Sequence, residues 1–431
     1  MSENILTEQA TAADQGEPTR LFRPLETSER LPAIDFVRGL ALLGILVVNT
    51  SSLFGPLLAS TDPRSVEHLP WWDQLVFVLV TGLFAGKFIS TFSMLFGYGL
   101  LSQIERAEAA GRSAVLFTLR RLAALAVFGL IHALGLWYGD ILFVYAGLGG
   151  ILLLVRRVSA RGLLVIAGIL LAINILITGG FQSLNTLFSE PLPTAPQVIP
   201  EDAPRGFEAM SKGPISPEWI QGEILAFREG PFADAFAYLL VNWLILLVFV
   251  PFFVACQIVG MFLLGGWMWR VRFFDPAQAG LRRQVLRFTL PLGLLLACLA
   301  MGLLMAGLQG SRPALVASVV AVLLSIPFLP LGYAALFSLL SERLPSWVSG
   351  PVICAGRMAL TVYLLETVLA TWLSYWWGWQ LFGRVGPAWQ LLIAMAIWSV
   401  LVLFASVWLR LFRRGPMENL WRWLEYGRLA S

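Results

Sequence analysis

Histidine and cysteine are scarce in this sequence, and their scarcity limits the chemistry that the chain can carry. The 431 residues include two histidines and three cysteines. Cys256, Cys298 and Cys354 each lie within an apolar run, which predicts small buried side chains rather than disulfides or a metal cluster. Because no histidines and cysteines are grouped, we expect neither zinc nor haem, and no metal site of any kind.

Charge is also scarce. Charged residues make up 13% of the chain and hydrophobic residues 58%, whereas soluble domains are usually about 25% charged. This composition predicts a polytopic membrane protein whose main partner is the lipid bilayer. The net charge of +4 comes from arginines at the ends of apolar runs. It therefore indicates membrane topology and not binding to nucleic acid.

The apolar runs predict an all-α, polytopic integral membrane helical bundle. About 20 apolar residues span a bilayer, and runs of this kind predict about ten transmembrane helices. The runs are 37–57, 73–104, 119–138, 141–155, 163–184, 236–269, 286–308, 314–340, 356–376 and 389–410. Two of them, 73–104 and 236–269, are too long for one straight crossing. We expect a kink or a break at Gly86-Lys87 and at Pro251.

The arginines predict the orientation of the bundle. With ten crossings, every strongly basic loop falls on the same side as both termini, which the positive-inside rule assigns to the cytoplasm. The expected divisions are a polar cytoplasmic tail at 1–30, transmembrane halves at 31–184 and 236–412 around an external loop at 185–235, and a basic cytoplasmic tail at 413–431.

The external loop 185–235 is rich in proline and acidic. It holds eight prolines, eight acidic residues and three basic residues. Two interpretations remain open for it, a simple connection between the two halves and a cap over an external acceptor site.

Four polar side chains fall at a similar depth on four different helices. Asn49 lies eleven residues beyond Arg38, roughly 16 Å along a helix. His132 lies at the same distance beyond Arg121, and Glu366 lies roughly 14 Å beyond Arg357. The fourth, Lys87, is near the middle of its long span. Since a buried charge costs at least about 2.5–3.5 kcal/mol in a membrane, a shared depth favours a common site.

Structural roles are the alternative for each polar residue. Asn49 would hydrogen-bond between helices, and His132 would be a satisfied core imidazole. Lys87 would bind a helix break or pair with Glu366. Asp35 and Arg38, at positions i and i+3, would form an ion pair at a helix start.

Asp140 has an alternative of its own, which is to cap the helix that follows it. His132 and Asp140 are eight residues apart, roughly 12 Å along a helix. This separation predicts no direct contact. We therefore expect a buried reaction point at His132 and a separate entrance residue at Asp140.

Several ordered segments resemble known membrane protein families. The segment "IDFVRGLALLGILVVN" (34–49) resembles the opening motif of the YeiB-like bacterial family, domain of unknown function 418, and that of the heparan-α-glucosaminide N-acetyltransferase family. Four later segments resemble the YeiB-like family, so that the likeness covers about 31–427. They are "FAGKFISTFSMLFGYG" (84–99), "RRLAALAVFGLIHALGLWYGDILFVYAG" (120–147), "GRMALTVYLLET" (356–367) and "FRRGPMENLWRWLEYG" (412–427).

The resemblance implies a membrane acyltransferase related to the acyltransferase-3 group, in the bacterial cytoplasmic (inner) membrane. Such proteins pass an acyl group from cytoplasmic acyl-CoA, here a co-substrate, to a sugar- or lipid-like acceptor on the far side. His132 would then be the general base, while Asn49 and Lys87 would stabilise the oxyanion. Asp140 would bind the acceptor. Asp35, Arg38 and Arg357 would form the mouth that binds the CoA phosphates.

Two positions depart from the heparan enzyme's pattern. The stretch after Asn49, "TSSLFGPLLAS", has no histidine, and His68 comes too late to align. The catalytic role would pass to His132, which belongs to the YeiB-like pattern. Glu366 stands where glutamine is expected, and its carboxylate would pair with Lys87 or orient His132.

Two other functions remain open. In a proton-coupled transporter or exporter of a small molecule or lipid-linked substrate, Lys87, His132 and Glu366 would relay protons. In a non-catalytic scaffold, the polar residues would only pack helices. Exposed apolar helix faces would allow a homodimer, whichever of these functions the protein has.

Overall fold

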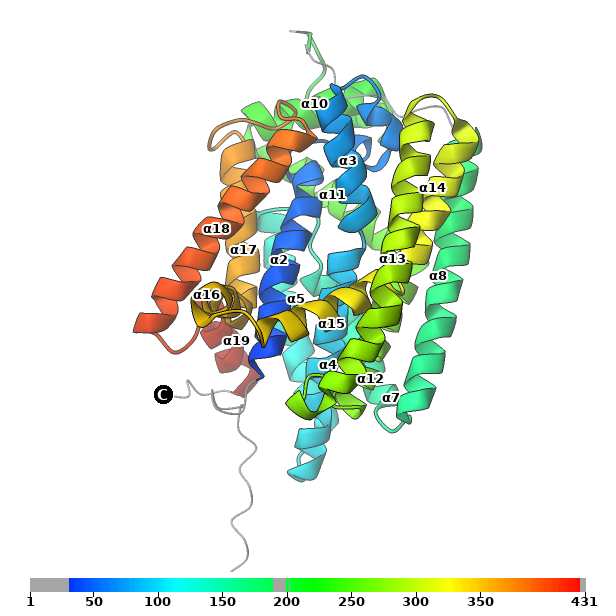
Figure 1. Cartoon of the computed structure of the whole chain (residues 1–431). Helices are drawn as coiled ribbons and strands as arrows, with labels where there is room; N and C mark the ends of the chain where they lie inside the picture. Colours follow the sequence, from blue (N-terminus) through cyan, green and yellow to red (C-terminus); the bar gives the residue numbers. More distant parts are fainter. Residues whose placement is uncertain (1–30, 189–198, 201, 427–431) are drawn as a thin grey trace, which may run out of the picture.

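The chain folds into a bundle of helices (Figure 1). The computed structural model describes residues 31–188, 199–200 and 202–426, and every regular element among them is helical. The first half comprises α2 (Pro32–Leu53), two 3-10 turns (Ala59–Thr61 and Pro63–Val66), α3 (Trp71–Leu83), α4 (Lys87–Ala109), α5 (Ala114–Gly135), α6 (Leu142–Gly149), α7 (Ile151–Val155) and α8 (Ala160–Phe188). Two shorter helices, α9 (Gly206–Ser211) and α10 (Pro217–Glu229), follow within the segment 185–235.

The second half begins with the apolar helix α11. Its elements are α11 (Phe232–Phe253), α12 (Ala255–Arg270), a 3-10 turn (Pro276–Gln278), α13 (Ala279–Leu308), α14 (Arg312–Ser325), α15 (Leu329–Ser341), α16 (Ser346–Arg357), α17 (Ala359–Ser374), α18 (Pro387–Leu411) and α19 (Pro416–Tyr426). In Figure 1, α15 and α16 run across the bundle, whereas α8, α13, α17 and α18 run along it.

The all-α membrane bundle expected from the apolar runs is confirmed. Among the described residues, seven helical segments are long and apolar enough to cross a membrane, or up to nine if each of two bent pairs is one span. The expected number of about ten is not confirmed. The predicted run 141–155 folds as the short helices α6 and α7, which together cover only Leu142–Val155 and are short for a crossing.

Both over-long runs are interrupted. The first breaks where predicted, because Gly86 adopts a φ of +75° between α3 and α4, a conformation that favours glycine. The Lys87 amine donates to the Thr81 carbonyl at 3.1 Å, and the Gln257 amide donates to the Gly86 carbonyl at 3.3 Å. These two side chains satisfy carbonyl groups that the break removes from the helix ladder.

The second interruption lies three residues beyond Pro251. The proline is inside α11, and the helix ends at Phe253 before α12 begins at Ala255. The Phe253 carbonyl accepts hydrogen bonds from Asn174 at 2.7 Å and from Thr178 at 3.1 Å. Polar side chains of α8 therefore compensate for this break.

Helix α2 forms the centre of the bundle and packs against α4, α15, α16, α17 and α18. It is the most buried of the long apolar helices. Gly356 of α16 makes one of these contacts so close that a Cβ atom there would lie 1.7 Å from the Asp35 carbonyl oxygen. Small residues of this kind allow helices in a membrane to approach closely.

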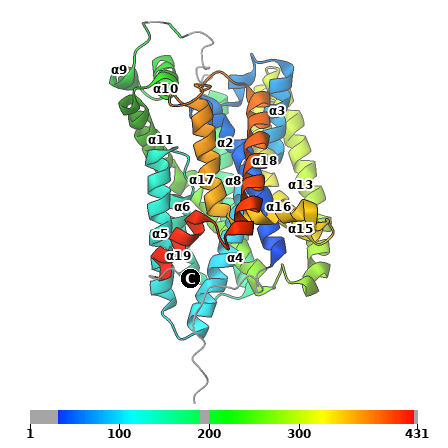
Figure 2. The ribbon, with the colours of Figure 1, turned by 90° about the vertical axis from the view of Figure 1, so that its left-hand side faces the viewer.

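The two ends of the bundle differ in charge. We call the end that carries Arg38, Arg106, Arg121 and Arg357 the arginine end, and the opposite end, which α10 covers, the α10 end. Figures 1 and 2 place α10 at one end of the bundle and α19 towards the other. The first described helix, α2, begins on the arginine side, and the last, α19, lies on the same side.

Candidate active site

A buried histidine and a buried aspartate contact each other directly. The Nδ1 atom of His132 lies 3.0 Å from Oδ1 of Asp140, and both side chains are fully enclosed. The expectation that these residues would not touch is wrong. Helix α5 ends at Gly135, and the chain then reverses direction, so that the eight-residue separation does not run along one helix.

The approach of the two segments depends on a glycine. A Cβ atom on Gly129 would lie 2.3 Å from the Phe143 nitrogen and 2.7 Å from Oδ2 of Asp140. That oxygen accepts the Phe143 N–H at 2.7 Å. Asp140 therefore caps the start of α6 and holds the imidazole with its other oxygen.

The second ring nitrogen of His132 also has a partner. Nε2 lies 3.0 Å from the Thr367 hydroxyl on α17. The Tyr363 ring, one turn earlier on the same helix, packs 5.0 Å from the imidazole, and Trp137 meets it edge-on at 6.4 Å. The imidazole thus lies between a hydroxyl group on one side and a carboxylate on the other.

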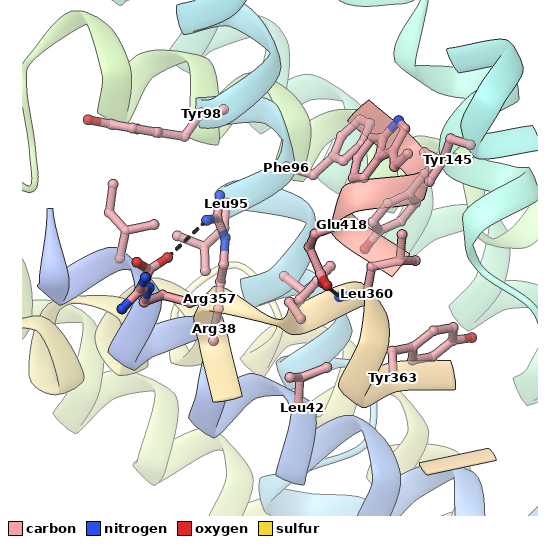
Figure 3. Close-up of a pocket in the computed structure, with 18 of the residues that line it drawn as sticks. Arg38, Leu42, Leu95, Phe96, Tyr98, Tyr145, Arg357, Leu360, Tyr363 and Glu418 are labelled. Atoms are coloured by element: carbon pink, nitrogen blue, oxygen red, sulfur yellow. Dashed lines mark hydrogen bonds and ion pairs between the residues drawn. The ribbon is translucent and has the colours of Figure 1, made fainter. Parts of the chain in front are cut away.

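A cavity of about 460 Å³ opens near this site towards the arginine end (Figure 3). Its mouth is strongly basic. Seven arginines line it, together with the acids Asp35 and Glu418: Arg38, Arg106, Arg121, Arg357, Arg413, Arg414 and Arg422. Arg38 pairs with Asp35 at 3.3 Å, as the spacing i and i+3 predicted. The inner part is apolar and ends at Ile45, Ile141 and Tyr363.

A smaller cavity of about 90 Å³ shares these three inner residues. Asn49 supplies an amide to its lining, and Gly139 and Ile141, on either side of Asp140, form one wall. His132 and Asp140 line neither of the two cavities. Tyr363 borders both cavities and also packs on His132, so its ring lies at the point where all three meet.

Helix α19 forms one side of the large cavity. The Glu418 carboxylate accepts the N–H groups of Leu360 at 2.8 Å and of Thr361 at 3.1 Å, at the start of α17. The bend between α16 and α17 is 86°, so this helix start needs an acceptor. The Arg121 guanidinium lies 4.2 Å above the Trp421 ring and joins α19 to α5.

Lys87 and Glu366 are buried and line neither of the two cavities. Lys87 binds the helix break through Thr81, one of the structural roles considered for it. Among the ion pairs of the described residues, none joins Lys87 to Glu366, and Oε1 of Glu366 is buried there without a hydrogen-bond partner. Thr367 and Asp140, rather than Glu366, contact and orient the imidazole. The described residues also contain no group of three or more histidine, cysteine or acidic side chains that could hold a metal.

Sequence reasoning missed Thr367, Tyr363 and Glu418. Tyr363 and Thr367 are four residues apart in "GRMALTVYLLET" and so share a helix face, which was the available signal. Glu418 gave no signal, because its role depends on the fold of the C-terminal segment.

The fold and the site define a class, that of helical membrane proteins with a buried histidine–aspartate pair near an arginine-lined cavity. Residues 268–428 match the family described as "Protein of unknown function (DUF418)". The chain belongs to this family of YeiB-like proteins. No solved structure matches it.

Similar proteins occur in bacteria. The chain is 31% identical to the uncharacterized protein YxaH of Bacillus subtilis, over 94% of this chain and 96% of that protein. It is 30% identical to the uncharacterized protein YeiB of Escherichia coli, over 92% and 96% respectively. An uncharacterized 39.9 kDa protein of Bacillus acidopullulyticus is 26% identical over 94% and 96%.

Proposed function

We propose that this protein is a transmembrane acyltransferase, which moves an acyl group from cytoplasmic acyl-CoA to an acceptor hydroxyl or amine at or beyond the outer face. One observation carries the proposal. The arginine-lined cavity ends at Tyr363, whose ring packs 5.0 Å from the imidazole of the His132–Asp140 pair. A polyanionic donor that enters this cavity brings its far end towards a general base.

The orientation follows from charge. Short basic loops favour the cytoplasmic side of a membrane, so the arginine end faces the cytoplasm in this proposal. Both ends of the described chain lie on that side, so this proposal places both termini in the cytoplasm. The α10 end then faces outward from the bacterial cytoplasmic membrane.

The large cavity suits a molecule with a charged head and an apolar arm. Guanidinium groups bind phosphates through paired hydrogen bonds, and Arg38 and Arg357 are two of the seven that line the mouth. Asp35 orients Arg38 from 3.3 Å. The apolar inner walls would hold the pantetheine arm and direct the thioester towards Tyr363.

The chemistry would be a direct transfer. The Asp140 carboxylate accepts a hydrogen bond from the Nδ1–H group of His132 and so leaves the Nε2 lone pair to act as a base, once the acceptor hydroxyl takes the place of the Thr367 hydroxyl. The acceptor oxygen attacks the thioester carbon while its proton passes to Nε2. The C–S bond then breaks and the thiolate takes the proton. Asn49, in the adjoining small cavity, would donate to the carbonyl oxygen as negative charge develops on it.

Binding of CoA tests this function without knowledge of the acceptor. Purified protein in detergent or nanodiscs is titrated with CoA and acetyl-CoA, and affinity is measured by calorimetry. Micromolar binding that weakens in Arg357→Ala supports the proposal. Absence of binding to CoA and to its short-chain and long-chain thioesters would overturn it.

A second candidate is a proton-coupled transporter or exporter. The buried Oε1 of Glu366, which has no hydrogen-bond partner among the described residues, favours it, since ionisable groups in a membrane often relay protons. Proton flux into proteoliposomes that disappears in Glu366→Gln would support transport. Wild-type flux in that variant would argue against it.

A further inference from the structure

The small cavity is a side pocket of the large one. Its volume is about 90 Å³, and it adjoins the large cavity at Ile45, Ile141 and Tyr363. Apart from Asn49 and the Tyr363 hydroxyl, its side chains are apolar, among them Val48 and Ile89. An uncharged apolar group is therefore the ligand that this pocket suits.

We propose that this cavity binds the acyl chain of the donor and restricts the donor to short acyl groups of about two to four carbons. The inference rests on the proposed function, because it assigns the acyl group of the same thioester. A volume of about 90 Å³ corresponds to about three groups of the size of a water molecule. It accommodates the one to three carbons that follow the carbonyl in acetyl to butyryl groups.

Aromatic rings lie directly behind two glycines of the pocket lining. A Cβ atom on Gly44 would lie 2.0 Å from the Phe88 ring, and one on Gly139 would lie 2.2 Å from the Trp137 ring. Both glycines are thus pressed against aromatic side chains. The pocket cannot widen at these positions unless large rings move.

The far end of the pocket is the break between α3 and α4. Phe84 and Gly86 line it there. The Lys87 amine and the Gln257 amide hold this break through the Thr81 and Gly86 carbonyls. Lys87 is accordingly a positioning residue for the end wall, and a longer acyl chain would have to displace a hydrogen-bonded backbone.

The position of the pocket agrees with this assignment. Gly139 and Ile141 flank Asp140, and Tyr363 packs on His132. A chain that enters the pocket fixes its own carbonyl near Tyr363 and within the reach of the Asn49 amide. The acyl group thereby positions the reacting carbon beside the histidine–aspartate pair.

The experiment compares CoA with its acetyl, butyryl, hexanoyl and palmitoyl thioesters on the full-length protein in nanodiscs, by calorimetry. Affinity should rise about fourfold for each chain methylene that enters the pocket and should fall at hexanoyl. Ile89→Ala and Val48→Ala enlarge the pocket and should move the optimum to hexanoyl. Ile89→Phe should lose butyryl-CoA and keep CoA.

Leu409→Ala is the matched control. Leu409 lines the large cavity and not the small one, so its truncation should change the affinity for every thioester by the same factor. Two independent enlarging variants guard against one that fails to fold, and each is checked by its melting temperature. If CoA binds but palmitoyl-CoA binds best, or if both enlarging variants keep the wild-type order, the acyl pocket is wrong while the donor stands. If neither CoA nor any thioester binds, the proposed function itself is wrong.

Discussion

The Nδ1 atom of His132 and the Oδ1 atom of Asp140 lie 3.0 Å apart across a chain reversal. The carboxylate favours the ring tautomer with its proton on Nδ1, and Nε2 then accepts a hydrogen bond from the Thr367 hydroxyl. Because Asp140 is also fixed by the Phe143 N–H at 2.7 Å, the ring has one orientation before any substrate arrives. Such preorganisation is what a general base requires.

Removal of the base or of its partner should abolish transfer. We expect His132→Ala to lower the rate of acyl transfer by about 10³-fold or more, and Asp140→Asn to lower it by about 10²–10⁴-fold through the wrong ring tautomer. The measurement is release of free CoA in the presence of membrane extract as acceptor. His68→Ala is the control, since this second histidine is exposed. Normal release in Asp140→Asn would remove the pair from the mechanism.

The Thr367 hydroxyl should matter for the resting state. Thr367→Val leaves Nε2 of His132 without its donor and should lower the free energy of unfolding by about 1–3 kcal/mol. Thr367→Ser keeps the hydroxyl and should restore most of the loss. Thermal melting measures both variants. Thr371→Val removes a hydroxyl that donates to the Thr367 and Val368 carbonyls of its own helix α17, so it should lower the stability less. An equal loss would show that the Thr367 hydroxyl has no special role.

Loss of an arginine at the mouth should weaken CoA binding. Arg357→Ala should reduce the affinity for CoA about tenfold, which corresponds to about 1.4 kcal/mol, because a charge-assisted bond to phosphate contributes about 1.5–3 kcal/mol. The residual affinity should also depend less on salt. Arg384, exposed between α17 and α18 and outside the cavity, is the control position. An equal loss in Arg384→Ala would indicate nonspecific charge attraction.

The packing of α10 should depend on pH. Glu223 of this helix is buried, accepts the Leu57 N–H at 3.3 Å and the Asn242 amide at 2.8 Å, and has the hydroxyl groups of Tyr138, Tyr238 and Tyr375 nearby. Burial raises the pKa of its carboxyl from 4.5 to about 7. The protonated form is thus favoured in the packed state, and its contribution is complete below pH 4.5. The contribution falls as pH rises to 7, by about 3 kcal/mol in total.

Hydrogen exchange of the α10 amides between pH 4.5 and 8, corrected for the intrinsic rate, measures this effect. As pH rises from 4.5 to 7, α10 should open more often, and above pH 7 the frequency of opening should level off. Glu223→Gln should remove the pH dependence. A wild-type profile that becomes more protected with rising pH would reverse the sign of the argument.

The sequence predicted the membrane helices better than it predicted their contacts. Hydrophobic runs located the spans, and Gly86 located the first break, because both depend on local chemistry. Four polar residues were grouped because of their shared depth. Of these, Asn49 lines a cavity near the His132–Asp140 pair, whereas Lys87 and Glu366 line neither cavity. Depth says how far a residue lies along a helix, whereas the side of the helix that faces the site depends on packing.

The His132–Asp140 contact was missed for a related reason. The estimate of their separation assumed a continuous helix, and the reversal after Gly135 shortened it. Thr367 was missed because a threonine within an apolar helix usually bonds its own backbone. Only the packing of α17 against α5 and the turn after it gives this hydroxyl an external partner.

The C-terminal helix α19 has a consequence for the handling of the protein. Glu418 accepts the N–H groups of Leu360 and Thr361, and Thr367 lies less than two turns further along α17. A truncation after Gly415 would leave these amides without their acceptor and would loosen the helix that holds the imidazole. Helix α19 is therefore a support for the imidazole of His132, and affinity tags or fusion partners belong at the other terminus.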